Sequence, residues 1–325
     1  MSLRIFSGFL VGAFAIYADL GVAQDYPTRP ITAIVPFAPG GPVDTITRIV
    51  SEHMSRTLGQ PIVIENVAGA GGTTGSTRAM RAVPDGYTII TGHMGTHAAA
   101  VGSYPDLAYD PRTDFEPLAL LAGTPTLIYA RKDFPPKDLG EFVVYVKANA
   151  DKLNNAHAGV GSVAYTTCLL LNHLLGVKPT MIPYNGGAPA LNALVAGQVD
   201  YMCDQIINGM AQVQSGQIKG YAIATPNRHP LLPNVPTTRE AGLPEYQASA
   251  WNAMFAPKGT RKPIIDKLNA AIVKALDDAT VRKRLLEIGS DIPDASGRTP
   301  EALAGLVKSE IDKWTPIMKE AAAAK

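Results

Sequence analysis

The stretch that decides the fold reads ITAIVPFAPGGPVD, residues 31–44. Its first half is an apolar run typical of a buried strand, and its second half is a glycine turn that opens a helical pattern. Such a turn is a receptor for an anion, because the free N–H groups of the helix and its dipole both face it. From Pro36 to Thr47 there is no Lys, Arg, Ser or Cys. The turn is therefore better suited to holding a carboxylate than to transforming it.

The first 23 residues read as a secretory signal. Arg4 gives a positive start, residues 5–16 form a short apolar run, and small residues at 21–23 fit a cleavage site. The apolar run is too short to span a bilayer, and no later segment has about 18 consecutive apolar residues. We expect the mature chain to be exported, with a buried N-terminal helix as the alternative interpretation.

Charge and cysteine content narrow the class of protein. The formal net charge is +1, and removing residues 1–23 leaves it unchanged because Arg4 and Asp19 are lost together. A balance this close to neutrality predicts no nucleic-acid partner and no electrostatic attachment to membranes. Cys168 and Cys203 are too few for a disulfide-built fold. Their spacing leaves both a disulfide and two buried free thiols open.

Strand, loop and helix alternate along the chain. Strands are expected at residues 31–37, 61–67, 87–91, 127–130, 199–203, 221–225 and 251–256. Helices are expected at residues 42–58, 73–82, 139–148 and 163–175, with three more starting near 263, 280 and 300. The alternation predicts an α/β fold with a mostly parallel sheet and with ligand loops at the carboxyl ends of the strands.

Two extended stretches, residues 116–130 and 248–257, are candidate crossings between lobes. A sheet that is left and re-entered gives a discontinuous first lobe, 26–123 plus 252–325, and a second lobe, 124–251. About 300 mature residues suffice for two lobes with separate cores. We expect a ligand cleft between the lobes and a hinge beneath it, with a single large doubly wound domain as the alternative.

A series of short motifs runs from residue 26 almost to the C-terminus. They are YPTRPI at 26–31, VPFAPGG at 35–41 with Asp44, IEN at 64–66, GAGG at 69–72, PDGYT at 84–88, PY at 183–184 with Gly187 and Pro189-Ala190, AGQVD at 196–200, LPNVPT at 232–237, EAG at 240–242 and KW at 313–314. In this order they resemble the receptors of tripartite tricarboxylate transporters, also called the Bug family.

The resemblance implies a fold, a function and a partner. The fold is that of type II periplasmic binding proteins, two α/β lobes with a ligand cleft between them. The function is capture of a small organic carboxylate in the periplasm, and the partner is a two-component membrane permease that receives it. We expect a monomeric, non-enzymatic receptor without cofactor or metal.

The resemblance also places a ligand site at loops that follow strands in both lobes. Family members hold a ligand carboxylate there through backbone amides and waters. The candidate ligand-binding residues are Phe37, Ala38, Gly40, Gly41, Asp44, Gly92, His93, Gly159, Gly161, Ser162, Val163, Tyr165 and Asp204. Asp204 is expected to orient a second polar end of the ligand. Asp44 fits equally well as a structural residue in the first turn of its helix.

The chain departs from the family pattern around the expected pocket. His157 stands where Ser is usual, Tyr165 where His is common, and Asn185 where Lys usually follows Tyr184. The identity of the substrate therefore does not carry over. We expect a dicarboxylate or an aromatic carboxylate. Tyr165 and His93 offer stacking faces, which favour a flat or aromatic acid, although Tyr165 also fits simple packing.

Other chemistries have weaker support in the sequence. His93 and His97 have the spacing of a metal site on a helix, but no acidic residue lies between them and no third ligand is evident. Residues 69–75 have the spacing G-x-G-x-x-x-G, which is not the dinucleotide-binding motif. Ser162 lacks the G-x-S-x-G context of a nucleophile and fits a helix N-cap or a donor to the ligand.

Two further functions stay open at this stage. One is a secreted hydrolase or lyase that pairs Ser162 with His157 or His93. The other is a sensory receptor that presents its ligand to a membrane kinase.

Overall fold

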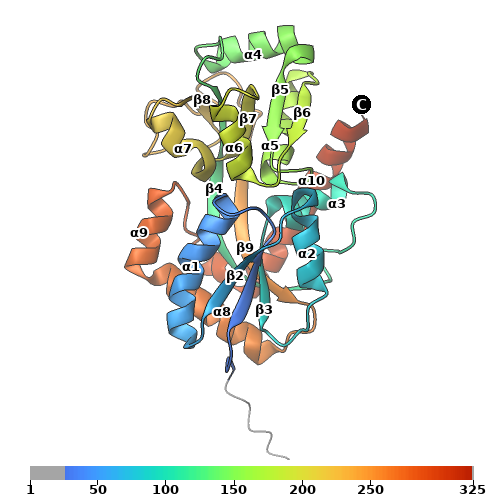
Figure 1. The fold of residues 1–325 in the computed structure, drawn as a ribbon, viewed down its shortest axis with the longest axis vertical. Helices are drawn as coiled ribbons and strands as arrows, with labels where there is room; N and C mark the ends of the chain where they lie inside the picture. Colours follow the sequence, from blue (N-terminus) through green and yellow to red (C-terminus); the bar gives the residue numbers. More distant parts are fainter. Residues whose placement is uncertain (1–25, 324–325) are drawn as a thin grey trace, which may run out of the picture.

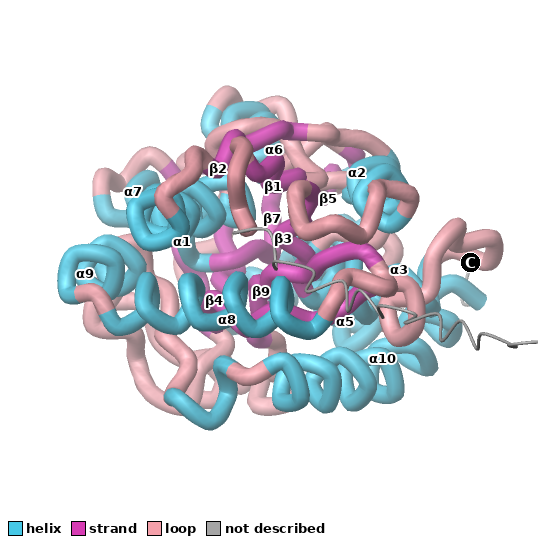
Figure 2. The backbone as a smooth tube through the Cα atoms, turned by 90° about the horizontal axis from the view of Figure 1, so that it is seen from below, coloured by secondary structure: helices cyan, strands magenta, loops and turns pink. Residues whose placement is uncertain are grey.

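The computed structural model describes residues 26–323 of the chain, so the signal peptide predicted at residues 1–23 lies outside the described residues. The described part forms two α/β lobes, one above the other in Figure 1, joined by the long strands β4 and β9 (Phe115–Arg131 and Ser249–Pro257). Seen from below, the strands occupy the centre and the helices surround them (Figure 2). None of the described helices is long and apolar enough to cross a membrane.

The first lobe has a sheet with helices on both faces. Its other strands are β1 (Ile31–Val35), β2 (Ile62–Asn66) and β3 (Thr88–His93), and its helices are α1 (Pro42–Leu58), α2 (Thr73–Met80), α3 (Ala100–Ser103), α8 (Lys262–Asp277), α9 (Ala279–Glu287) and α10 (Pro300–Ala323). Side chains of β1 alternate between two cores. Ile31 and Ala33 pack with α1, α8 and α9, whereas Ile34 packs with α10. Burial on both faces explains the nearly continuous apolar sequence of this strand.

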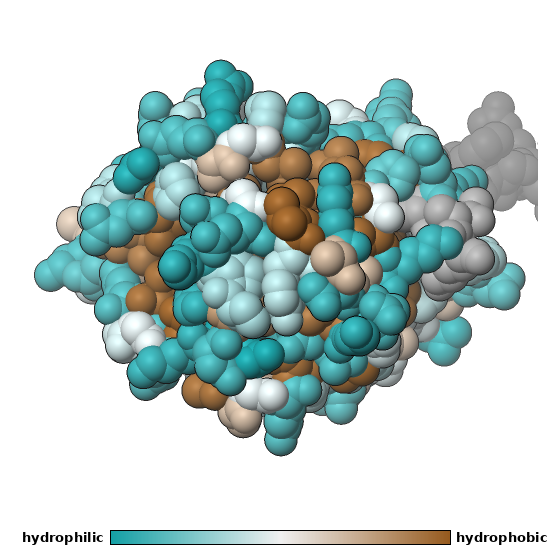
Figure 3. Space-filling view, turned by 90° about the horizontal axis from the view of Figure 1, so that it is seen from above, coloured by the Kyte–Doolittle hydropathy of each residue, from teal (hydrophilic) through white to brown (hydrophobic). Residues whose placement is uncertain are grey.

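The second lobe repeats this layered arrangement. Its strands are β5 (Asn154–His157), β6 (Thr180–Pro183), β7 (Tyr201–Gln205) and β8 (Ile218–Ile223), and its helices are α4 (Leu139–Asn149), α5 (Val163–Leu175), α6 (Gly187–Val195) and α7 (Ile206–Gln214). α4 and α5 share one core, with Phe142 and Leu171 fully buried, and α6 and α7 share the core on the other face. Hydrophilic side chains cover most of the upper surface, with apolar residues gathered in small areas between them (Figure 3).

The strands β4 and β9 connect the lobes. β4 pairs with β9 from Phe115 to Pro125 and then with β7 and β8 from Thr126 onward. In the described residues this continuity joins the strands into one nine-stranded sheet with the order β2-β1-β3-β9-β4-β7-β5-β6, and β8 pairs with β4 beside this path. A shared pair of strands lets the lobes move relative to each other by bending at the crossing.

The prediction of a mostly parallel sheet is wrong. The pairs β1–β2, β1–β3, β5–β6 and β5–β7 are parallel, but β3–β9, β4–β9, β4–β7 and β4–β8 are antiparallel. β4 and β9 cross between the lobes in opposite directions, so each introduces antiparallel pairing wherever it enters a lobe. The third strand also extends further than predicted, because Gly92 and His93 lie in β3 and not in the loop after it.

The cysteines lie in the core of the second lobe. Cys168 of α5 and Cys203 of β7 are both free and fully buried. The thiol of Cys168 lies 3.8 Å from the carbonyl oxygen of Cys203. Of the two alternatives that the spacing left open, the structure has the free thiols.

Candidate functional site

A small cavity lies where the two lobes meet. The first lobe contributes Phe37, Gly41, Pro42, Val43 and His93, and the second lobe contributes Ala158, Ser162, Val163, Ala164, Gly187, Asp204 and Gln205. Its volume is about 20 Å³, which is room for about one water molecule. The two lobes therefore approach each other closely around this cavity.

The cavity is built from the beginnings of helices. Pro42 and Val43 start α1, Val163 and Ala164 start α5, Gly187 starts α6, and Gln205 is the N-cap of α7. Each helix N-terminus carries unpaired N–H groups and a partial positive charge of about 0.5. The described residues that line the cavity include no Lys and no Arg. The positive groups that the lining offers to an anion are therefore backbone amides.

The turn between β1 and α1 is held in place by Asp44. Its carboxylate accepts hydrogen bonds from the Gly40 amide, from Arg48 Nε and from Asn66 Nδ2, each at 2.9 Å. Burial opposes the charged form, but the hydrogen bonds from Arg48, Gly40 and Asn66 outweigh burial, so the pKa of Asp44 is lowered. Asp44 is thus a structural anion of the turn, since its oxygens already have partners.

His93 is held in one tautomer at the end of β3. Its Nδ1 accepts hydrogen bonds from the amides of Gly95 at 2.8 Å and Thr96 at 3.1 Å. Burial lowers its pKa to about 4, so the ring is neutral at physiological pH and carries its proton on Nε2. One face of the ring stacks on Phe37, with the ring centroids 5.0 Å apart. His93 therefore offers the cavity a neutral hydrogen-bond donor.

Ser162 caps the helix that enters the site from the second lobe. Its Oγ accepts a hydrogen bond from the Tyr165 amide at 3.1 Å, which confirms the predicted N-cap. The hydroxyl proton stays available for a ligand, because the cap uses only the oxygen as an acceptor. The loop before it turns at Gly159 and Gly161, whose φ values are 101° and 80°.

Asp204 and Gln205 close the cavity at the end of β7. The Gln205 Oε1 accepts hydrogen bonds from Thr124 Oγ1 of β4 at 2.7 Å and from Asn252 Nδ2 of β9 at 2.9 Å. The side-chain nitrogen Nε2 of Gln205 has no hydrogen-bond partner among the described residues, so it can donate to a ligand. The crossing strands are thereby connected to the wall of the cavity through one residue.

The sequence as a whole matches a known family of receptors. The family model described as "Tripartite tricarboxylate transporter family receptor" matches residues 46–322. The chain belongs to this family. In a receptor of this family the interlobe cavity is where a solute is captured, so the lining residues above are the candidate ligand-binding surface.

Solved structures with the same fold include ligand-bound receptors. MatC of Rhodopseudomonas palustris, solved with bound malate, is 55% identical, with a TM-score of 0.88 and coverage of 90% of this chain and 100% of that one. The periplasmic binding protein BugD is 42% identical, with a TM-score of 0.88 and coverage of 91% and 99%. A second Rhodopseudomonas palustris protein, solved with adipate, is 32% identical, with a TM-score of 0.87 and coverage of 92% and 99%.

The structure distributes the predicted site residues between the cavity and its surroundings. Those that line the cavity are Phe37, Gly41, His93, Ser162, Val163 and Asp204. Those that lie around it are Ala38, Gly40, Asp44, Gly92, Gly159, Gly161 and Tyr165. Their observed contacts are with the protein itself: Ala38 donates to Asn185 O across the lobes at 3.1 Å, and a Cβ at Gly92 would overlap the His97 ring.

Tyr165 faces a different hollow of the second lobe, which it lines together with His157 and Leu169. Its ring packs against His157 at a centroid distance of 5.0 Å. This is the packing role that the sequence allowed as its alternative.

Sequence reasoning missed the other cavity residues, which are Pro42, Val43, Ala158, Ala164, Gly187 and Gln205. All of them except Gln205 are small or apolar, and none carries a charge or a nucleophile that would mark a site. The available signal was position, because most of them sit at or beside the start of a helix. The helix α6 that begins at Gly187 was not predicted as a helix.

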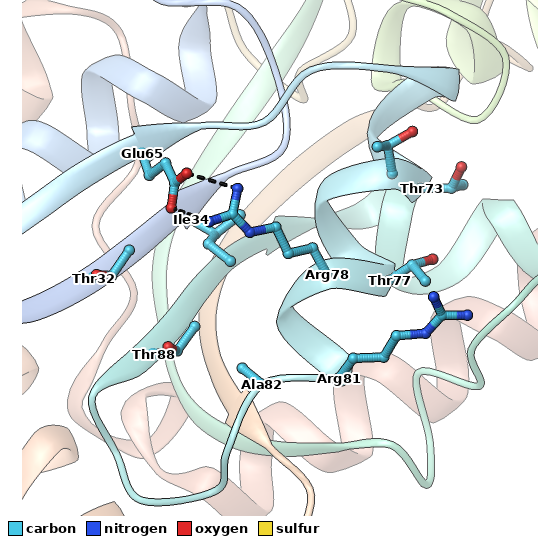
Figure 4. A pocket seen from close by; sticks show the side chains of 10 residues that line it. Thr32, Ile34, Glu65, Thr73, Thr77, Arg78, Arg81, Ala82 and Thr88 are labelled. Carbon is cyan, nitrogen blue, oxygen red and sulfur yellow. Dashed lines mark hydrogen bonds and ion pairs between the residues drawn. The ribbon is translucent and has the colours of Figure 1, made fainter.

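A more open hollow on the first lobe has different chemistry (Figure 4). Threonines from β1, β3 and α2 line it, including Thr32, Thr88 and Thr77. Arg78 extends from α2 to Glu65, and their side chains form an ion pair at 2.7 Å. The hollow involves residues of one lobe, so closure of the two lobes does not shape it.

The side chains considered for the enzymatic and metal alternatives have other partners in the structure. Among the described residues, Ser162 Oγ is hydrogen-bonded to the Tyr165 amide and to neither His93 nor His157. His97 packs in the first-lobe core, stacked on Phe255 at 4.2 Å. Residues 26–323 contain no group of three or more His, Cys, Asp or Glu side chains placed to hold a metal ion.

Proposed function

We propose that this receptor captures a small dicarboxylate between its lobes in the periplasm and delivers it to a two-component membrane permease. The observation that carries the proposal is the convergence of the N-termini of α1, α5, α6 and α7 on one cavity whose wall contains no Lys or Arg. Relatives solved with malate and with adipate support a ligand with two carboxylates.

The same features account for useful affinity without a basic side chain. A hydrogen bond from an amide to a carboxylate contributes about 1.5–3 kcal/mol. Several such bonds offset the cost of ordering the ligand and closing the lobes, and they support a Kd in the micromolar range or below. An aromatic acid is less well supported, because Phe37 already covers one face of His93 and Tyr165 lies in another hollow.

The proposal includes the organisation of the chain. The first lobe comprises residues 26–123 plus 252–325 and the second lobe residues 124–251, and the change of partner of β4 near Thr126 supports these limits. Residues 1–23 are the leader that directs export, and the mature receptor acts as a monomer without a cofactor. Closure over the ligand gives the permease a surface made of both lobes.

Isothermal titration calorimetry of the mature protein, residues 24–325, tests the proposal. The panel contains malate, adipate, benzoate, acetate and citrate, and each ligand is recovered and analysed after titration. We expect saturable one-to-one binding of a dicarboxylate and unchanged ligand. Consumption of the ligand would establish an enzyme instead, and absence of binding across the panel would refute the carboxylate assignment.

A further inference from the structure

We propose that Asp204 binds the ligand in its protonated form and donates that proton to a ligand carboxylate, so that the receptor takes up one proton with each dicarboxylate. This inference rests on the proposed function, because it concerns the same cavity. In this role Asp204 recognises one end of the ligand, because its proton can be donated to a carboxylate oxygen there.

Asp204 is a buried carboxyl with few partners. Its side chain lines the cavity, and the residue is 3% exposed. Oδ1 accepts a hydrogen bond from the Gln205 amide at 2.8 Å, and Oδ2 accepts one from Asn208 Nδ2 at 2.9 Å. Both donors are neutral, and Asn208 also donates to Gly187 O at 3.1 Å. Two neutral hydrogen bonds are a weak set of partners for a buried charge.

Within residues 26–323, the groups that surround Asp204 offer no cation. Tyr129 of β4 approaches through Asn208, while Cys203 precedes it on β7 and Cys168 comes from α5. His93 across the cavity and His157 at the end of β5 have pKa values lowered by burial to about 4, so both are neutral. The nearest arginine of the first-lobe turn, Arg48, is paired with Asp44.

The charge balance of the loaded cavity requires a proton. The four helix N-termini, with about half a positive charge each, can compensate about two carboxylates. A dicarboxylate and Asp204 together bring three carboxylates into the same small space, where they repel one another, so one of the three binds a proton. Burial already raises the pKa of Asp204 to about 7, although the hydrogen bonds from Gln205 and Asn208 oppose the shift. An ordinary carboxyl group has a pKa of about 4, so Asp204 and not the ligand holds the proton.

The protonated carboxyl then acts as a donor. Its O–H donates to a ligand oxygen, and such O–H···O⁻ bonds are short and strong. The complex forms only with protonated Asp204, whatever the pH of the solution. Above about pH 7 the free protein must therefore gain a proton on binding, and its Kd increases by up to tenfold per pH unit.

Titration calorimetry of malate between pH 5.5 and pH 9, in pairs of buffers with different ionisation enthalpies, measures the number of protons taken up. We expect nearly one proton at pH 8 to 9, almost none at pH 5.5, and a Kd that is constant below pH 6. Asp204→Asn keeps a neutral donor at this position, so it should bind malate with a pH-independent Kd and no proton uptake. The surface variant Asp151→Asn is the matched control and should behave as the unmodified protein.

The outcomes separate this inference from the proposed function. Binding of malate without proton uptake at pH 8 would overturn the inference and leave the function intact. Loss of malate binding in a folded Asp204→Asn variant would also overturn it, because an ionised Asp204 would then be accepting a hydrogen bond from the ligand hydroxyl. Absence of dicarboxylate binding at every pH would overturn the proposed function itself. If Asp204→Asn does not fold, the proton count of the unmodified protein decides alone.

Discussion

Gly41 is the residue at which the backbone of the first lobe meets the cavity. Its φ of −81° is one that proline adopts, and its amide donates to no other group among the described residues. The adjacent Gly40 differs, because its amide is used by Asp44. One residue of this turn therefore supports the structure while the next has an amide free for a ligand.

Gly41→Pro removes that amide with little change to the folded turn. We expect malate to bind about one to two orders of magnitude more weakly, because one charge-assisted hydrogen bond of about 1.5–3 kcal/mol is lost. The melting temperature should stay close to that of the unmodified protein, since proline fits the φ of this residue. Calorimetry and thermal unfolding measure the two quantities.

The control at the same position is Gly41→Ala, which keeps the N–H group. Its Cβ would meet nothing closer than the Gly187 nitrogen at 3.7 Å, an ordinary contact. We expect affinity near that of the unmodified protein. Equal affinities for the proline and alanine variants would exclude the Gly41 amide as a ligand donor.

At the scale of elements, the end of α3 is fastened to the loop between β5 and α5. The Tyr104 hydroxyl lies 2.7 Å from Val160 O in the second lobe and 2.8 Å from Ala70 O in its own lobe. It has one proton, so it donates to one of these carbonyls at a time. The bond to Val160 exists in the closed arrangement and links elements that are far apart in the sequence.

Tyr104→Phe should favour the open arrangement of the lobes. The lost hydrogen bond is worth about 1 kcal/mol, so we expect the Kd for malate to increase by about fivefold. Tyr145→Phe is the control. Tyr145 lies on the distant helix α4 and packs against Phe134, so its substitution should leave the Kd unchanged. A Tyr104→Phe variant with unaltered affinity would show that this contact does not stabilise closure.

At the scale of the whole molecule, closure depends on the absence of a side chain at Gly71. This residue has a φ of 62°, and a Cβ there would overlap the Val160 carbonyl of the other lobe. The overlap occurs when the lobes are closed, because Val160 belongs to the second lobe. Gly71 is therefore a position where the closed and open states tolerate different residues.

Gly71→Ala should hold the lobes apart. We expect at least a tenfold increase in the Kd for malate, and small-angle X-ray scattering should show a radius of gyration that no longer decreases when malate is added. Gly59→Ala is the matched control, because Gly59 has a φ of 70° and nothing lies within 4 Å of its Cβ position. Both variants carry the same backbone strain of about 1–2 kcal/mol. Compaction of the Gly71→Ala protein with malate would contradict this account of closure.

Most local strands and helices follow from the order of residues along the chain. The periodicity of residues 31–58 predicted β1 and α1, because the apolar pattern of a buried strand or of an amphipathic helix depends on residues that are close in the sequence. The same reasoning located the extended crossings that became β4 and β9. It did not find β5, whose residues Asn154 to His157 lack an apolar pattern. That strand is stabilised by its neighbours, since Asn155 Nδ2 donates to Tyr201 O of β7 at 3.1 Å.

Which of these strands and helices meet depends on the packing of the whole chain. Asp204 and His93 line one cavity because β7 and β3 end at the junction of the lobes, and Gly187 joins them because α6 begins there. The side chain of Gln205 is held at the cavity by hydrogen bonds from Thr124 on β4 and Asn252 on β9. Local patterns encode strands and helices, whereas the distance between their ends depends on how the sheet crosses between the lobes and how far the lobes close. The cavity that we propose to bind an anion exists at that level, since it is built from helix N-termini that are separate along the chain.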